Sequence, residues 1–269
     1  MDQIGSALDR ANIHRPPLEA QRTCETHGAY TAKCYLGDVW TKCPTCADVE
    51  KAREENAQKD RDAAAALERW NKSVEGAGIP ERFRDRRFKT YVAETPQQEN
   101  ALNIAKQYAK EWEAVRANGR SMVFLGPPGT GKTHIACAIA MHVMHKHHAS
   151  VMFKTVAQAV RGVRDTWSKG CDKSESQAIA ELTSPQLLVL DEVGIQSGSE
   201  WERNVLFDIL NERYLKRRPT IMLTNLSQEE LPKFLGERVL DRMREDGGLI
   251  VPFLWASHRG RLANTREST

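Results

Sequence analysis

Residues 126–133 carry the types and the spacing that are most informative about chemistry in this chain. They read Gly-Pro-Pro-Gly-Thr-Gly-Lys-Thr, a full match to the phosphate-binding loop pattern, and they directly follow the apolar run at 122–125. Glycines let backbone N–H groups curl around phosphate, the lysine contacts β- and γ-oxygens, and the final hydroxyl ligates Mg²⁺. The predicted nucleoside triphosphate site comprises Gly126, Pro127, Pro128, Gly129, Thr130, Gly131, Lys132 and Thr133.

Two later apolar runs end in polar residues that would complete such a site. Residues 187–190 end in Asp191 and Glu192, and residues 220–224 end in Asn225. The carboxyl edge of a parallel sheet is where α/β proteins bind ligands. We therefore assign Asp191 to Mg²⁺, Glu192 to activating the attacking water, and Asn225 to that water or the γ-phosphate.

The elements that must position these residues alternate along the chain. Alternating βα units predict an α/β fold whose parallel sheet lies between layers of helices. A helix is expected at about 97–117, ahead of the loop. The expected strands are 121–125, 150–155, 186–191, 220–224 and 248–253, and the expected helices are 132–147, 156–168, 174–182, 200–215 and 228–243.

Two short chelating pairs near the N-terminus have the spacing of a zinc module. Cys24-x-x-His27 and Cys43-x-x-Cys46 are separated by fifteen residues, which can form a small hairpin. Four such ligands converge tetrahedrally on Zn²⁺. Cys34 leaves a second set open, in which four thiolates bind the metal, but His27 completes a two-residue-spaced chelate and is preferred. Scattered reduced cysteines are the alternative without a metal.

Between the cysteines and the phosphate loop, composition predicts a solvated helix. Residues 47–72 are dominated by Ala, Glu, Lys, Arg, Gln and Asp, and Gly76-Ala77-Gly78-Ile79-Pro80 ends the run. The sequence therefore predicts a zinc-binding module at 1–46, a charged helical linker at 47–75, and a nucleotide-binding domain at 76–269.

Overall charge and hydropathy exclude few functions. Charged residues make up 28% of the 269 positions and the formal net charge is +3. Basic clusters lie at 82–89 and 216–218, and for each one solvated surface and phosphate contact both stay open. No apolar stretch approaches the ~18 residues of a membrane helix and no signal pattern opens the chain, so a cytoplasmic protein without membrane contact is expected.

With these motifs, the chain resembles the AAA+ ATPases of the DnaC-type replicative helicase loaders over about residues 76–262. The most telling stretches include Leu188 to Gly194, Thr224-Asn225, Leu235 to Met243 and Trp255 to Arg259. The resemblance implies a lidless AAA+ fold, since only sixteen residues follow Phe253. It also implies ATP hydrolysis and loading of a DnaB-type replicative helicase onto single-stranded DNA. The family includes IstB-type helpers of transposition, which keeps a transposase-associated ATPase as the alternative.

The resemblance assigns further residues. Arg242 is similar to the arginine finger that acts on a neighbouring subunit, with Arg238 as the second choice, and Arg259 is similar to the sensor-2 arginine. A finger acting in trans implies an ATP-dependent homo-oligomer. Arg164 and Trp167 resemble a basic and aromatic pair that contacts single-stranded DNA, although Trp167 also has the spacing to extend a buried stripe.

Overall fold

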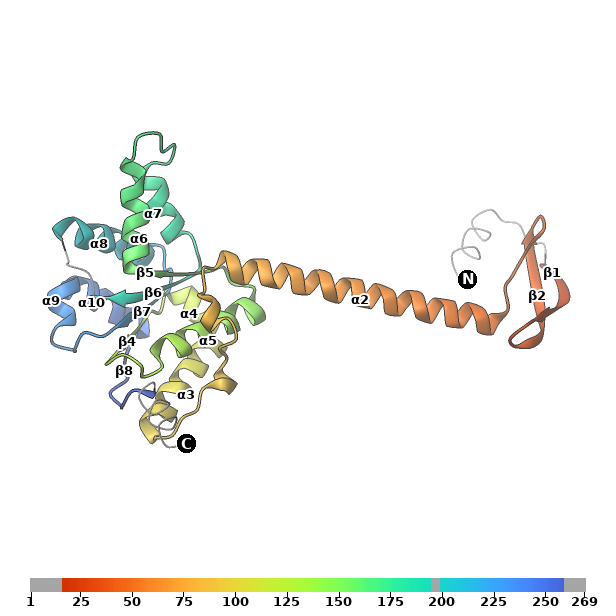
Figure 1. Cartoon of the computed structure of the whole chain (residues 1–269), viewed down its shortest axis with the longest axis horizontal. Helices are drawn as coiled ribbons and strands as arrows, with labels where there is room; N and C mark the ends of the chain where they lie inside the picture. Colours follow the sequence, from red (N-terminus) through yellow and green to blue (C-terminus); the bar gives the residue numbers. More distant parts are fainter. Residues whose placement is uncertain (1–15, 195–198, 259–269) are drawn as a thin grey trace, which may run out of the picture. The chain divides into compact units, whose positions relative to one another are not determined.

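The computed structural model describes residues 16–194 and 199–258. The chain divides into two compact units, Met1–Trp70 and Asn71–Thr269. The division falls inside a helix of 33 residues, α2 (Pro44–Gly76). Figure 1 follows the chain from the strands of the first unit through α2 to the helices and strands of the second.

The first unit is a small antiparallel sheet followed by most of α2. Its strands are β1 (Leu18–Cys24), β2 (Gly28–Leu36) and β3 (Val39–Trp40), in that order in the sheet. Cys24 pairs with Gly28 where the β1–β2 hairpin turns, and this turn carries the first chelating pair. Cys43 directly precedes α2 and Cys46 lies in its first turn. No residue of α2 within the first unit is buried, as expected for a helix with so few apolar side chains, and Val74, which is buried, belongs to the second unit.

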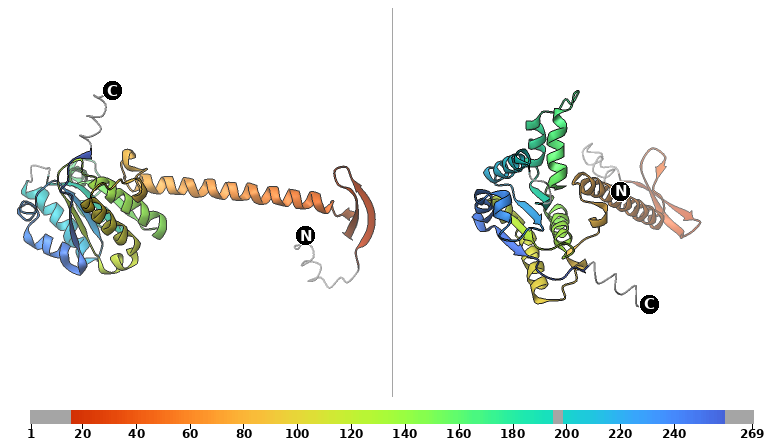
Figure 2. Two further views of the ribbon diagram at one scale, coloured as in Figure 1. Left: turned by 90° about the horizontal axis from the view of Figure 1, so that it is seen from below. Right: turned by 60° about the vertical axis from the view of Figure 1, so that its left-hand side comes forward.

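The second unit has a five-stranded parallel sheet of order β5-β6-β7-β4-β8. Its strands are β4 (Met122–Leu125), β5 (Val151–Thr155), β6 (Leu187–Val193), β7 (Thr220–Thr224) and β8 (Leu249–Pro252). The side chains of β4 are fully buried, because helices cover both faces of the sheet (Figure 2). The predicted α/β class with a five-stranded parallel sheet is confirmed.

Two helix layers bury this sheet. The helices are α3 (Pro96–Lys110), α4 (Trp112–Asn118), α5 (Lys132–His147), α6 (Val156–Arg164), α7 (Glu175–Thr183), α8 (Glu200–Leu215), α9 (Leu231–Leu235) and α10 (Glu237–Arg244). Single 3₁₀ turns lie at η1 (Glu81–Phe83), η2 (Phe88–Thr90), η3 (Asp165–Trp167) and η4 (Glu245–Gly247). Helix α3 packs against α5, while α6 to α10 pack against one another around a shared apolar cluster.

The element boundaries depart from the sequence prediction in four places. The helix expected at 97–117 is divided at Glu111 into α3 and α4. The helix expected at 228–243 is divided at Gly236, whose φ of 83° is a left-handed conformation that ends α9 before α10 begins. The helix expected at 156–168 ends at Arg164 and continues as η3. Strand β1 was not predicted.

Among residues 16–194 and 199–258, no helix has both the length and the apolar character needed to span a membrane.

Candidate functional site

The phosphate-binding loop connects the carboxyl end of β4 with the amino end of α5. Helix α5 begins at Lys132, after Gly131 with a φ of 95°. Gly126, with a φ of 144°, lies so close to β8 that an added Cβ would stand 2.3 Å from the carbonyl oxygen of Phe253. Both positions therefore require glycine. The backbone N–H groups of the loop and of the first turn of α5 form a site that attracts anions such as phosphate.

Lys132 lies folded over this loop. It is 7% exposed, and its Nζ donates hydrogen bonds to the carbonyl oxygens of Gly126, at 2.6 Å, and Pro127, at 2.8 Å. The same Nζ donates to Oδ1 of Asn225 at 3.0 Å. The structure thus brings the predicted lysine of α5 and the predicted asparagine after β7 into direct contact, although 93 positions separate them.

Thr133 and Asp191 form the second contact between predicted residues. Oγ1 of Thr133 donates to Oδ2 of Asp191 at 3.0 Å, so a hydroxyl and a carboxylate converge at the carboxyl edge of the sheet. These oxygens are the hard ligands that Mg²⁺ prefers, and the pair fits that ion. Burial raises the pKa of Asp191 above its ordinary value, while hydrogen bonds from Glu192 N–H and Thr133 oppose the rise.

Glu192 follows Asp191 in an unusual backbone conformation. Its φ is 61°, and the register of β6 against β7 shifts between Leu190 and Val193. The N–H of Glu192 donates to Oδ1 of Asp191 at 2.7 Å, which fixes the turn. A non-glycine residue at positive φ is uncommon and is concentrated at functional sites. The bulge interrupts the regular alternation of side chains at the end of β6, where the two carboxylates follow the apolar run.

Tyr91, Trp255 and His258, which carry no individual role in the sequence prediction, contact the loop. The ring of Tyr91 lies against Gly131, where an added Cβ would stand 2.7 Å from Cε2. Nε1 of Trp255 donates a hydrogen bond to the carbonyl oxygen of Thr130 at 2.9 Å. The backbone N–H of His258 donates to the carbonyl oxygen of Gly129 at 3.0 Å. In the sequence, the only signal for the contact of Trp255 was an aromatic residue shortly after the last strand, and the contact itself becomes visible only in the fold.

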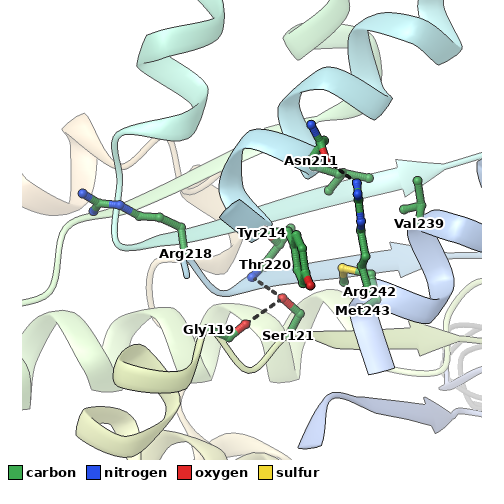
Figure 3. Close-up of a pocket in the computed structure, with 10 residues that line it drawn as sticks. Gly119, Ser121, Asn211, Tyr214, Arg218, Thr220, Val239, Arg242 and Met243 are labelled. Carbon is green, nitrogen blue, oxygen red and sulfur yellow. Dashed lines mark hydrogen bonds between the residues drawn. The ribbon is translucent and has the colours of Figure 1, made fainter. Parts of the chain in front are cut away.

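Arg242 lies at the other end of β4 from the phosphate loop. It lines a pocket with Gly119 and Ser121, which precede β4, and with residues of α8 (Figure 3). Its Nη1 donates to Oδ1 of Asn211, and its guanidinium lies 5.0 Å from the ring centre of Tyr214. Arg242 is therefore remote from the phosphate loop of its own chain. Arg238 is exposed on α10. The predicted sensor residue Arg259 lies outside the described residues.

The predicted DNA-contacting pair is joined by a third side chain, Trp201. The rings of Trp167 and Trp201 have centres 4.8 Å apart, and the guanidinium of Arg164 lies 5.1 Å from the Trp201 ring. Arg164 also pairs with Glu202 at 3.1 Å, and Nε1 of Trp167 donates to Glu175. Trp167 remains 58% exposed, so it does not extend the buried stripe of α6.

Four predicted metal ligands meet in the first unit. The ligand atoms of Cys24, His27, Cys43 and Cys46 all lie within 4.8 Å of one another. Nδ1 of His27 lies 3.7 Å from Sγ of Cys24, 3.8 Å from Sγ of Cys43 and 3.3 Å from Sγ of Cys46. Zn–S bonds of about 2.3 Å in a tetrahedron place ligand atoms roughly 3.8 Å apart. Cys34 lies outside this group, and its thiol donates to the Gly37 carbonyl oxygen at 3.0 Å.

The thiols of this cluster influence one another. Hydrogen bonds from the backbone of Thr26 and His27 lower the pKa of Cys24 to about 6, which favours its thiolate. The hydrogen bond with Cys24, whose Sγ lies 3.5 Å away, raises the pKa of Cys46 to about 11. Neighbouring thiolates repel one another unless a cation lies between them. The donor set of three thiols and one imidazole therefore fits a soft divalent ion such as Zn²⁺.

Comparison with known proteins places this site in a family. Residues 101–246 match the family model described as IstB-like ATP binding protein. The replicative helicase loader DnaC of Escherichia coli K12 is 39% identical over 213 residues, which cover 76% of this chain and 85% of that protein. The chain belongs to the DnaC-type helicase-loader family. The loader of Buchnera aphidicola from Schizaphis graminum is 34% identical over 210 residues, with 76% and 84% coverage.

Solved structures agree on the fold. A crystal structure of the DnaC helicase loader has a TM-score of 0.58 at 24% identity, covering 64% of this chain and 99% of that one. The replication initiator DnaA bound to AMPPCP and single-stranded DNA has a TM-score of 0.55 at 19% identity, covering 71% and 56%. The 39% identity with the Escherichia coli loader confirms the resemblance to the DnaC-type family that the motifs indicated, and ATP is the nucleotide expected of the family's site.

Proposed function

We propose that this chain is an ATPase that loads a replicative DNA helicase of DnaB type onto single-stranded DNA. The observation that carries the proposal is the assembled nucleotide site, with Lys132 on Asn225 and Thr133 on Asp191, in a chain that matches replicative helicase loaders over 76% of its length. The intact site argues against a loader-like protein whose nucleotide machinery has been lost.

In the proposed reaction, the residues of the loop hold ATP and those of β6 and β7 act on water. Lys132 neutralises charge on the β- and γ-phosphates, and the backbone of residues 126–131 surrounds them. Thr133 and Asp191 would hold Mg²⁺, which when bound withdraws charge from the phosphate oxygens. Glu192 accepts a hydrogen bond from the attacking water and orients it toward phosphorus. Asn225 holds Lys132 and donates from its amide to the water or the γ-phosphate.

We propose further that the γ-phosphate meets Arg242 of a neighbouring copy. The distance along β4 between Arg242 and its own loop supports a role in trans, because one copy presents the arginine and the next presents ATP. Asn211 and Tyr214 position the guanidinium before assembly. ATP then promotes assembly, since the bound phosphate gives the arginine its partner. Arg259 is proposed as a second arginine acting on the same nucleotide.

Single-stranded DNA is proposed to contact Arg164 and Trp167. The exposed Trp167 ring offers a surface on which a base stacks, and Arg164 offers a cation to the adjoining phosphate. Because Trp201 contacts both side chains, it fixes their spacing.

Zn²⁺ is proposed as the ion held by Cys24, His27, Cys43 and Cys46. It would lock the β1–β2 turn to the start of α2, since the four ligands come from these two places. This module is a platform for a macromolecular partner, either the helicase or DNA.

A second function has its own support. The family model over residues 101–246 is named for IstB-like proteins, so a transposase-associated ATPase is the competing proposal. Partner capture separates the two. The Glu192→Gln variant, which should keep ATP bound, is immobilised with ATP and exposed to purified helicase or transposase. Retention of helicase that Lys132→Ala fails to reproduce supports the loader. Retention of transposase alone supports the alternative.

A further inference from the structure

A basic groove lies at the edge of the second unit where the strands begin. It has a volume of about 310 Å³, and none of its lining residues belongs to the nucleotide site. Its residues precede β4, β6 and β7, which places the groove at the opposite edge of the sheet from the phosphate loop. The lining residues are Arg116, Ala117, Gln186, Lys216, Arg217 and Arg218. Four of these six carry a positive charge and none carries a negative one.

The turn that carries three of these charges is held rigidly by the buried Arg213. This side chain is 0% exposed, and its guanidinium donates to the carbonyl oxygens of Leu182, Pro185 and Pro219 at 2.7 to 3.1 Å. It also donates to Oγ1 of Thr220 at 2.9 Å. Arg213 therefore ties the end of α8 to the segments before β6 and β7.

The backbone of the turn is constrained as well. Arg217 has a φ of 49°, a conformation that favours glycine, yet an arginine occupies it. The α4–β4 turn packs so closely here that an added Cβ on Gly119 would stand 2.8 Å from Cα of Arg217. Non-glycine residues in such backbone conformations cluster at functional sites.

The charges differ in how they are compensated. Arg116 pairs with Glu113 at 3.0 Å and Lys216 pairs with Glu212, and exposed pairs of this kind are weak enough to exchange for another anion. Within residues 16–194 and 199–258, no carboxylate forms an ion pair with Arg217 or Arg218. Figure 3 shows Arg218 extending away from Tyr214 and Arg242, so it belongs to the groove and not to the Arg242 pocket alone.

We propose that this basic groove binds the phosphodiester backbone of single-stranded DNA. Three of its four cations are arginines, whose planar forks match phosphate oxygens. An acidic peptide would also need apolar contacts, and the apolar lining is limited to Ala117. No aromatic ring lines the groove, so it contacts phosphates without stacking on bases. The inference rests on the proposed function, because that function brings a single strand to the protein.

The test measures how salt weakens DNA binding. A fluorescein-labelled oligothymidylate is titrated with the full chain at several salt concentrations from 50 to 200 mM, and anisotropy is recorded. The test variant is Arg217→Ala with Arg218→Ala. The matched control is Lys106→Ala with Lys233→Ala, which removes the same charge from exposed positions on α3 and α9. Retained ATP binding and an unchanged thermal melting curve show that each variant is folded.

Each phosphate contact on a single strand contributes about −0.7 to the slope of log K against log salt. Losing two contacts should therefore make the slope shallower by about 1.4, and across a fourfold change in salt the wild-type chain should lose about sevenfold more affinity than the variant. The control should keep the wild-type slope, and Arg217→Lys with Arg218→Lys should keep it too because both charges remain.

A test variant with the slope and affinity of the control overturns the groove while leaving the proposed function in place. A variant that keeps its DNA affinity but loses capture of purified helicase also overturns it, and assigns the groove to an acidic protein surface. If the wild-type chain itself binds no oligonucleotide, both this inference and the proposed function fail.

Discussion

Replacing the buried Arg213 by methionine should destabilise the second unit severely. Methionine fills much of the volume but donates no hydrogen bond. The carbonyl oxygen of Pro219 keeps a bond from the N–H of Leu188, whereas those of Leu182 and Pro185 lose the donor that holds them. Two buried acceptors at about 1–3 kcal/mol each give roughly 2–6 kcal/mol. Relief of the guanidinium's desolvation, which lowers the pKa of Arg213 to about 9, offsets part of this.

We therefore expect a loss of about 2–4 kcal/mol in the free energy of unfolding, below the top of that range because of the offset. Urea unfolding followed by tryptophan fluorescence measures it, since Trp112 is 1% exposed and reports on this unit. The midpoint should fall by roughly 1–2 M. Arg218→Met is the matched control, because this half-buried arginine should cost under about 1 kcal/mol. A loss below about 1 kcal/mol for Arg213→Met would show that these carbonyl oxygens do not depend on the guanidinium.

Four further outcomes are expected. Lys132→Ala should abolish ATP binding in a fluorescent-nucleotide titration, whereas Glu192→Gln should bind ATP and release no phosphate; unchanged affinity in the lysine variant would contradict the site. Metal analysis should find close to one zinc per chain and none after Cys43→Ser, with the ATPase unit still folded; wild-type protein purified without chelators and lacking zinc would exclude the module. Trp167→Ala should lose about 1–3 kcal/mol of single-strand affinity without affecting ATP binding, and wild-type affinity would remove that tryptophan from the DNA site. Arg242→Ala should bind ATP without hydrolysing it, yet a mixture with Lys132→Ala should regain phosphate release; no recovery between co-assembling variants would argue against a finger in trans.

The core of the nucleotide site could be predicted because its signals are local. Each apolar strand ends in the polar residue that the site uses, and parallel strands bring their carboxyl ends together. The contacts of Lys132 with Asn225 and of Thr133 with Asp191 follow from that topology. The bulge at Glu192 could not be predicted, because it depends on how β6 pairs with β7 and not on the order of residues.

Other parts of the structure are decided by packing alone. Tyr91 and Trp255 contact the phosphate loop, although neither residue type at its position indicates such a contact in the sequence. Trp201 lies on a different helix from Trp167, whose ring it contacts, so its spacing along the chain gives no indication of the contact. Cys34 could not be separated from the ligand set by spacing, but in the sheet its thiol bonds to the Gly37 carbonyl oxygen instead of joining the cluster.

Helix boundaries were misjudged where a glycine or a turn interrupts a continuous apolar pattern. Gly236 divides α9 from α10 although leucines and a methionine continue on either side. The periodicity of apolar residues reports the buried face of a segment, and it does not report whether the backbone bends within it. The division matters for function, because α10 carries Arg242.

Circular DNA can show whether this chain uses ATP to place a ring helicase on single-stranded DNA. A closed ring cannot thread onto a circle that has no end, so stable helicase on circular single-stranded DNA requires ring opening. Purified helicase is incubated with the circle, ATP and this chain, and DNA-bound helicase is measured after gel filtration. Helicase should be found on the circle with the wild-type chain, and only background levels should be found with Lys132→Ala. Background levels with the wild-type chain, under conditions where it binds both ATP and the circle, would contradict helicase loading by this chain.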